Sequence, residues 1–176
     1  PNNPYANRDP RLYESVLTNG DVFRGRVAEL WIGGQERRSE AQTQARTGYI
    51  VRKFMLDCDN STSRGSITHW PYLRMAEIYL SYAEAINEFN GGPTPEAYRC
   101  VNIVRNRVGI GDLPAGLSQE EFREALILER ALEFCMEEVR WFDLIRWKRE
   151  ADFRKPLYGV NVRGTSNAGP FTYEKH

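Results

Sequence analysis

Three glutamates spaced four residues apart form the pattern with the most chemical potential. Glu129, Glu133 and Glu137 share one face of a predicted helix, because residues four apart are neighbours there. Two carboxylates about 5–10 Å apart in an open cleft are the acid and base of a glycoside hydrolase. The same segment also carries arginines and an aspartate, however, and such alternation of positive and negative side chains is typical of a structural ion-pair network between helices. We therefore assign scaffold roles to the three glutamates and to Arg130, Arg140, Asp143 and Arg146.

Other catalytic chemistries lack their residues. The chain has two histidines, His69 and His176, and three cysteines without a Cys-x-x-Cys pair. It contains no His-Glu-x-x-His, Gly-x-Ser-x-Gly or Walker sequence. Lys plus Arg and Asp plus Glu both number 24, so no global field attracts nucleic acid. We expect no enzyme, no cofactor, no metal and no nucleic-acid partner.

A second candidate site is the polar loop that begins at Trp31. The flat face of a tryptophan ring can stack on the CH face of a sugar, and recognition groups often lie on loops held by a rigid scaffold. Gly33 and Gly34 indicate flexibility, and the loop of residues 31–46 is rich in hydrogen-bonding side chains. The predicted ligand contacts are Trp31, Gln35 and Arg37. Burial of Trp31 at the edge of the core is the alternative.

The elements that position these residues divide the chain into three stretches. Residues 1–70 read as loops and short strands, with a hairpin across residues 11–24 and a strand within residues 48–54. Residues 71–155 have helical periodicity. Residues 156–176 read as an irregular tail rich in Gly, Asn and Pro.

The helical stretch carries clear boundary signals. Gly91-Gly92 ends the first predicted helix, Thr94-Pro95 starts the second, and Ser118 with Glu121 forms a capping box for the third. Helical sequence resumes from Arg140 to Arg149. Within it, we expect core positions for Trp141, Phe142 and Trp147. No stretch approaches the roughly 20 apolar residues of a membrane helix, and no signal peptide is visible.

Residues 129–147 resemble the hallmark of the SusD/RagB family, Glu-Arg-x-x-Glu-Leu-x-x-Glu-Gly-x-Arg-x-x-Asp-Leu-x-Arg-Trp. Two positions depart from it, namely Phe134 for Leu and Glu138 for Gly, and the second affects the turn between two helices. The matching residues are Glu129, Arg130, Glu133, Glu137, Arg140, Asp143, Leu144, Arg146 and Trp147.

Further segments resemble the same family, in the same order along the chain. Residues 73–85 are similar to its Arg-x-Ala-Glu-x-Tyr-Leu-x-Tyr-Ala-Glu-Ala helix, and residues 101–107 to its Ile-Asn-x-Val-Arg-x-Arg segment. Residues 7–12 and 47–54 resemble its strand region. The resemblance thus covers most of residues 7–160.

The resemblance implies a mainly α fold of tetratricopeptide-like antiparallel helical hairpins, with short strands and long irregular loops. Family members are lipid-anchored proteins of the outer-membrane surface. They bind oligosaccharides or other nutrients and deliver them to a SusC-type TonB-dependent transporter. Members are usually much longer, so we expect this chain to be the C-terminal part of one domain. The N-terminal part and the lipid anchor would then lie outside it.

Two alternatives remain beside this non-enzymatic, nutrient-binding function. A helical scaffold that binds only protein would show an exposed apolar patch in a groove between its helices. A glycoside hydrolase would need an open pair of carboxylates, which burial and arginine pairing of Glu129 and Glu133 would exclude. For the scaffold residues, we expect Arg140 and Asp143 to be buried and ion-paired with groups on neighbouring helices. We also expect large apolar side chains to remain exposed where the missing part would cover them.

Overall fold

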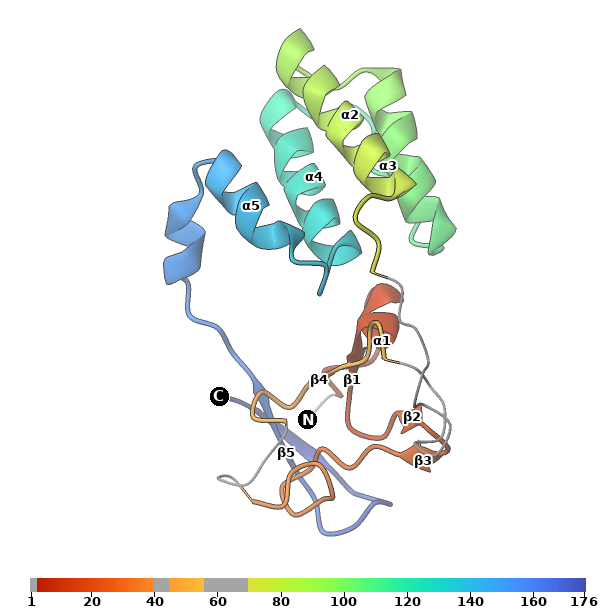
Figure 1. Ribbon diagram of the computed structural model, residues 1–176, viewed down its shortest axis with the longest axis vertical. Helices are drawn as coiled ribbons and strands as arrows, with labels where there is room; N and C mark the ends of the chain where they lie inside the picture. The colour runs from red at the N-terminus through yellow and green to blue at the C-terminus, as the bar shows by residue number, and fades with distance from the viewer. Residues whose placement is uncertain (1–2, 40–44, 56–69) are drawn as a thin grey trace. The chain divides into compact units, whose positions relative to one another are not determined.

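The computed structural model describes residues 3–39, 45–55 and 70–176, which form two compact units (Figure 1). The helical unit comprises Asp9–Arg11 and Trp70–Arg149. The strand-and-loop unit comprises Pro1–Arg8, Leu12–His69 and Glu150–His176. The C-terminal segment therefore groups with the N-terminal part of the chain rather than with the helices that precede it.

The predicted helices are confirmed. The helical unit contains α2 (Met75–Asn90), α3 (Pro95–Arg107), α4 (Gln119–Glu133) and α5 (Val139–Arg146). The boundary signals act as expected: the Thr94 side chain accepts from the Ala97 N–H, and Ser118 and Glu121 form both bonds of a capping box. Gly91 ends α2 in the left-handed conformation, with φ of 69°. The fold is mainly α, as predicted.

The core of the helical unit lies where α2, α3 and α4 meet. Ala83 and Ala97 are fully buried there, and small side chains let the helix backbones approach closely. Phe122 packs edge-on against Tyr98, with ring centroids 5.1 Å apart. The other buried members of this core are Leu80, Cys100, Val101, Val104, Leu126 and Phe134.

The expected core positions of Trp141 and Phe142 are wrong. These side chains are 57% and 68% exposed, whereas Trp147 packs partly buried against the core. The short helix α5 buries only Asp143 and Leu144. Trp141 and Phe142 therefore lie on the exposed side of the helix. Periodicity indicates that α5 is a helix, but it does not indicate how wide its buried face is.

The strand-and-loop unit contains short two-stranded sheets. The strand β1 (Val16–Leu17) pairs antiparallel with β4 (Ile50–Val51), which lies within the strand predicted at residues 48–54. The strand β2 (Val22–Phe23) pairs with β3 (Arg26–Val27). Arg24 and Gly25 have φ of 52° and 73°, as a tight hairpin turn requires.

The hairpin predicted across residues 11–24 is wrong. Residues Arg11–Ser15 form the short helix α1 instead, and the strand after it pairs with β4. The Asp9 side chain accepts the Arg11 backbone N–H at 2.9 Å, which favours a helical start. The turn at Asn19-Gly20 exists, but the hairpin that follows it closes one turn later, at Arg24-Gly25.

The C-terminal segment is more ordered than the irregular tail that the sequence predicts. A 3-10 helix, η1 (Glu150–Arg154), precedes the antiparallel hairpin of β5 (Val160–Arg163) and β6 (Thr172–Lys175). The Ile32 N–H donates to the Val162 carbonyl at 2.8 Å, and the Val160 N–H to the Thr47 carbonyl at 2.8 Å. The hairpin thereby holds the segment that contains Trp31.

Candidate functional site

Two glutamates of the hallmark string are buried and shared among several arginines. Glu129 is 1% exposed and accepts from Arg11 at 2.7 Å and from Arg105 at 3.0 Å. Glu133 is 2% exposed and accepts from Arg11 at 3.0 Å and Arg107 at 2.8 Å. Arg74 also pairs with Glu133, and with Glu137 at 2.7 Å. These contacts tie α4 to α3, to the segment before α2 and to Asp9–Arg11.

A second cluster joins α4 to α5 and α2. Arg130 makes a bidentate pair with Asp143, at 2.7 and 3.0 Å, and both side chains are almost fully buried. Arg146 donates to Asp143 at 2.8 Å and to Glu84 of α2 at 2.7 Å. The Trp147 indole N–H donates to Glu84 at 2.7 Å. The hallmark residues therefore hold three helices together.

Arg140 is an exception to the expected network. Asp143 is buried and ion-paired as predicted, but Arg140 is only half-buried. Its guanidinium donates to the Ile127 carbonyl at 3.4 Å, and we find no ion pair for it in the described part of the chain. The physical reason is that Arg130, on the facing helix, already pairs with both oxygens of Asp143. The prediction for Asp143 is therefore confirmed, and the prediction that Arg140 is buried in an ion pair is wrong.

The electrostatics of this cluster oppose acid–base catalysis by its glutamates. Burial alone would raise the pKa of Glu133, but hydrogen bonds from Arg74 and Arg11 outweigh it and hold the pKa below its ordinary value. A glycosidase acid needs a raised pKa and access to substrate. Glu133 has neither, and Glu129 is equally buried between two arginines. These two residues are therefore excluded as a hydrolase pair.

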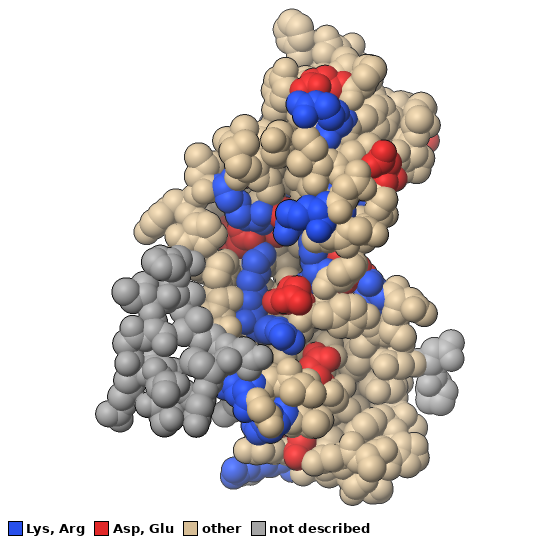
Figure 2. Space-filling view, turned by 90° about the vertical axis from the view of Figure 1, so that its right-hand side faces the viewer, with Lys and Arg blue, Asp and Glu red and all other residues tan. Residues whose placement is uncertain are grey.

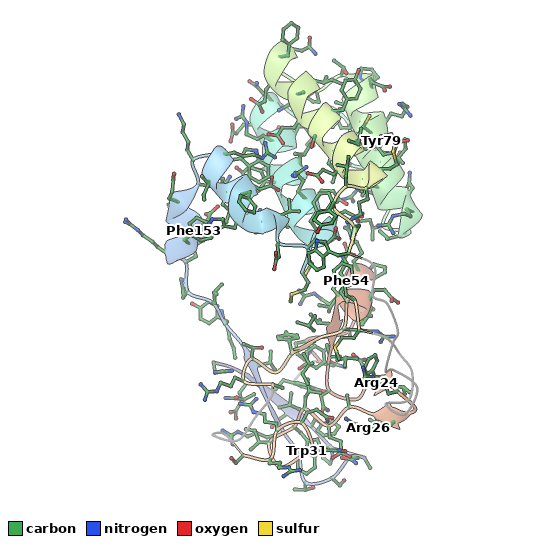
Figure 3. All side chains as sticks on the ribbon, in the orientation of Figure 1. Arg24, Arg26, Trp31, Phe54, Tyr79 and Phe153 are labelled. Atoms are coloured by element: carbon green, nitrogen blue, oxygen red, sulfur yellow. The ribbon has the colours of Figure 1, made fainter. Side chains whose placement is uncertain are left out.

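Trp31 lies half-buried in the strand-and-loop unit, and the structure holds it firmly (Figure 3). Its indole N–H donates to Asn167 at 3.0 Å, and Asn167 donates to Glu29 at 2.6 Å. A Cβ on Gly33 would lie 2.7 Å from the Trp31 ring, so this glycine allows close packing. The interpretation of Gly33 as a source of flexibility is thus replaced by a packing role.

The two other predicted contacts in this loop differ from each other. Gln35 is exposed, and its backbone N–H donates to the Glu29 carboxylate at 3.1 Å. Arg37 is 4% exposed and donates to Asn161 at 2.6 Å and to the Val160 carbonyl at 3.3 Å. Because its guanidinium is engaged with β5, burial argues against a direct ligand contact by Arg37. Residues 40–44 of the same loop lie outside the described residues.

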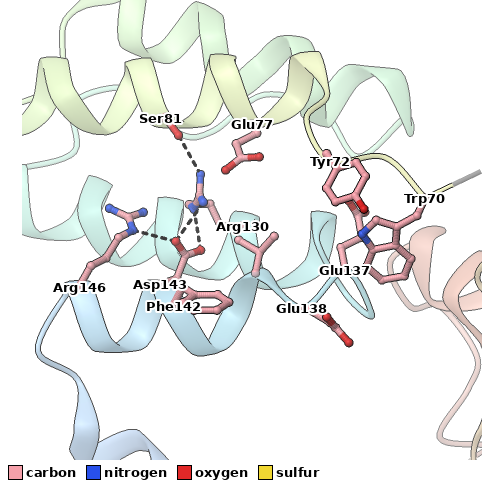
Figure 4. Close-up of a pocket in the computed structure, with 11 residues that line it drawn as sticks. Trp70, Tyr72, Glu77, Ser81, Arg130, Glu137, Glu138, Phe142, Asp143 and Arg146 are labelled. Atoms are coloured by element: carbon pink, nitrogen blue, oxygen red, sulfur yellow. Dashed lines mark hydrogen bonds and ion pairs between the residues drawn. The ribbon is translucent and has the colours of Figure 1, made fainter.

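The helical unit also contains an open pocket of about 510 Å³ that the sequence did not single out (Figure 4). Aromatic side chains from Trp70, Tyr72 and Phe142 line it, together with the carboxylates of Glu77 and Glu138. Arg130 and Arg146 also line it but are paired with Asp143. The aromatic Trp70-Pro71-Tyr72 just before a helix start is the signal that could have indicated it.

Basic side chains (Lys and Arg, blue) adjoin acidic side chains (Asp and Glu, red) over the helical unit in the upper part of Figure 2. Among the described residues, no group of three or more His, Cys, Asp or Glu side chains could hold a metal ion. None of the helices described is both long enough and apolar enough to span a membrane.

Comparison with known proteins identifies the family to which this chain belongs. A model of the SusD family matches residues 1–175. The chain belongs to the SusD family. Within it, SusD-like protein P25 of Formosa agariphila is 37% identical over 153 residues, which are 77% of this chain and 29% of that relative. SusD-like protein P2 of the same organism is 37% identical over 95 residues, covering 50% of this chain and 19% of the relative.

Solved structures of SusD-like proteins have the same fold. A SusD-like protein from Bacteroides fragilis superposes with a TM-score of 0.74 at 30% identity, covering 97% of this chain and 34% of that one. A SusD-like carbohydrate binding protein from the same species has a TM-score of 0.69 at 24% identity, covering 89% and 32%. This SusD-family chain therefore spans about a third of the length of the solved proteins it matches.

Proposed function

We propose that this chain is part of a non-catalytic protein that binds an oligosaccharide at the outer-membrane surface and delivers it to a SusC-type TonB-dependent transporter. The observation that carries the proposal is the family match over residues 1–175. One structural neighbour is described as a carbohydrate binding protein, although at 24% identity that likeness establishes only the fold. In this proposal, a lipid anchor holds the full-length protein at that surface.

A non-catalytic role is supported by the chemistry of the helical unit. Its buried glutamates are shared among arginines, which removes their carboxylates from substrate. We assign a structural role to these hallmark side chains. Ligand capture then depends on surface groups elsewhere, through aromatic stacking and hydrogen bonds.

Trp31 and Gln35 are the surface groups we propose for sugar contact within this chain. The Trp31 ring is oriented by Asn167 and by packing on Gly33, so little conformational entropy remains to be lost on binding. Gln35 is exposed nearby in the sequence and its side-chain amide can both donate and accept hydrogen bonds. This combination of a held ring and an exposed amide suits a neutral sugar.

The test is a glycan array with the full-length protein, followed by calorimetry on the glycans that bind. We expect saturable binding of at least one oligosaccharide without release of shorter products. Turnover of the bound glycan would overturn the non-catalytic role, and no binding across the array would overturn glycan as the ligand class. Co-purification with a transporter from outer membranes tests delivery separately.

A further inference from the structure

The turn between β5 and β6 lies against the segment that contains Trp31, although the two are far apart in sequence. The Trp31 indole N–H donates to the Asn167 side chain at 3.0 Å, across a separation of 136 residues. The backbones join as well, because the Ile32 N–H donates to the Val162 carbonyl at 2.8 Å. The β5–β6 turn therefore supplies a polar side chain at the edge of the Trp31 ring.

Hydrogen bonds from both sides fix the orientation of the Asn167 amide. An indole N–H only donates, so the amide oxygen faces Trp31, and a carboxylate only accepts, so the amide nitrogen faces Glu29 at 2.6 Å. Glu29 is itself held, since its other oxygen accepts the Gln35 backbone N–H at 3.1 Å. A Cβ on Gly34 would lie 2.4 Å from the Glu29 carbonyl oxygen, so the loop packs closely there. One donor and one acceptor are thus presented in a fixed order beside the ring.

The amide and the carboxylate keep hydrogen-bonding capacity that their neighbours do not use. An amide nitrogen carries two hydrogens, and a carboxylate has about four acceptor sites. Within the described part of the chain, one hydrogen of Asn167 and two acceptor sites of Glu29 are engaged. Asn167 is exposed and Glu29 is half-buried, so both can be reached from the surface. The remaining donor and acceptors are available to a ligand.

The chemistry of these three groups selects a class of ligand. A sugar that stacks its CH face on an aromatic ring presents hydroxyl groups at the edge of that ring. A hydroxyl both donates and accepts, so one hydroxyl can donate to Glu29 while its neighbour accepts from Asn167. A sulfate or carboxylate group offers only acceptors and would be repelled by the Glu29 charge. The arrangement therefore favours a neutral sugar over an anionic one.

We propose that Glu29 and Asn167 are direct sugar contacts that form one subsite with Trp31, and that this subsite binds a neutral pyranose through two adjacent hydroxyl groups. Asn167 is also the positioning residue of the Trp31 ring, because it accepts the indole N–H. The inference rests on the proposed glycan-binding function. It adds the β5–β6 turn as a second wall of the site and a pair of hydroxyl groups as what is recognised.

The experiment is calorimetry on the full-length protein with a panel of neutral hexasaccharides, namely cello-, laminari-, xylo-, manno- and maltohexaose. The subsite variants are Glu29→Gln, which keeps the volume, and Asn167→Ala. The matched controls are Glu174→Gln on the same hairpin and Asn106→Ala in the helical unit, both exposed and bonded to charged side chains elsewhere. We expect at least one hexasaccharide to bind, each subsite variant to weaken it about tenfold, and the controls to leave it unchanged.

Two outcomes of this measurement would overturn the proposal. One is an affinity of both subsite variants equal to that of the controls. The other is a parent protein that binds no member of the panel. If acidic glycans on the array bind in that case, the proposed glycan-binding function stands and only the neutral subsite is wrong.

Derivatives of the tightest-binding hexasaccharide that each lack one hydroxyl separate direct contact from mere support of the ring. We expect removal of the hydroxyl that Glu29 accepts to weaken binding to the parent protein about tenfold. The same removal should weaken binding to Glu29→Gln much less, because that bond is already impaired there. If every derivative loses the same factor in both proteins, Glu29 only supports the ring, and the direct contact is overturned.

Discussion

Carboxylates lie in different surroundings in two regions of the molecule. One is the hallmark cluster of the helical unit, formed by Glu129, Glu133 and the arginines paired with them. The other is the Trp31 segment of the strand-and-loop unit, formed by Trp31, Glu29 and Asn167. In the cluster, Glu133 is 2% exposed and three arginines surround its carboxylate. In the Trp31 segment, Glu29 and Asn167 hold a half-buried ring at the surface. The difference teaches that burial, rather than residue type, separates a structural charge network from side chains that remain accessible at the surface.

Removing the most shared carboxylate should have the largest effect. Glu133→Gln keeps the volume but leaves Arg11, Arg74 and Arg107 without its charge. Breaking a buried pair typically lowers the free energy of unfolding by about 3–5 kcal/mol. Chemical denaturation of the full-length protein measures this loss. The control is Glu120→Gln, which breaks an exposed pair with Arg123 and should cost about 0–1 kcal/mol; equal losses would contradict the comparison.

Two substitutions in the second cluster compare the stability contributed by a buried ion pair with that contributed by a half-buried arginine. Asp143→Asn removes the charge that Arg130 and Arg146 share, and we expect a loss of about 3 kcal/mol. Arg140→Ala removes one long hydrogen bond to a carbonyl and should cost about 1 kcal/mol or less. Thermal and denaturant unfolding of both variants measure these losses. A larger loss for Arg140→Ala would show that the assignment of these two roles is reversed.

The Trp31 segment should respond in binding rather than in stability. Trp31→Ala should weaken glycan binding by roughly 1–3 kcal/mol, by analogy with aromatic stacking on bases. Calorimetry with a glycan identified on the array measures this change, and a melting curve checks the fold. Arg37→Lys is the matched control, because this buried arginine contacts β5 and should affect stability more than affinity. Unchanged affinity of Trp31→Ala would remove the segment from the binding site.

Acidification should weaken the hallmark cluster selectively. The pKa of Glu133 lies below its ordinary value of 4.5 in the folded protein, so the folded state binds fewer protons than the unfolded state. The stabilisation that Glu133 contributes is therefore complete above that ordinary value and is lost as the pH falls through the folded pKa. Asp9, whose pKa Arg11 also lowers, acts in the same direction.

Melting temperatures between pH 7 and pH 3 measure this dependence. The Glu133→Gln variant should lose less stability than the parent protein over the acid part of that range, since its amide does not titrate. Parallel curves for the two proteins would mean that other carboxyl groups, and not Glu133, control acid unfolding.

The smallest expected change is a gain at the turn between α4 and α5. Glu138 has φ of 61°, a left-handed conformation that most residues adopt at a cost, and the family pattern has glycine at this position. Glu138→Gly should therefore stabilise the protein by about 1 kcal/mol. Denaturant unfolding measures the gain, and Glu138→Ala, which keeps the Cβ, should not show it.

The amino-acid sequence by itself determined the helices α2, α3 and α4 with their boundary signals, and the family. Thr94, Ser118 and Gly91 mark boundaries through contacts with their own neighbours in the chain, so local pattern is sufficient to predict them. The hallmark string also predicted that Asp143 is buried in an ion pair. That prediction succeeds because a charge at a buried helical position has to be paired.

Only the tertiary structure decided which distant residues meet. The pairing of Val16 with Val51, the bond from Ile32 to Val162 and the hairpin of the C-terminal segment join residues far apart in sequence, and no local signal specifies such partners. The same reason explains why Arg130 is buried in a pair with Asp143 while Arg140 is only half-buried, and why Arg37 is buried while Trp31 is half-buried. Which charge is buried depends on the neighbours that the fold supplies, and these are known only once the chain has packed.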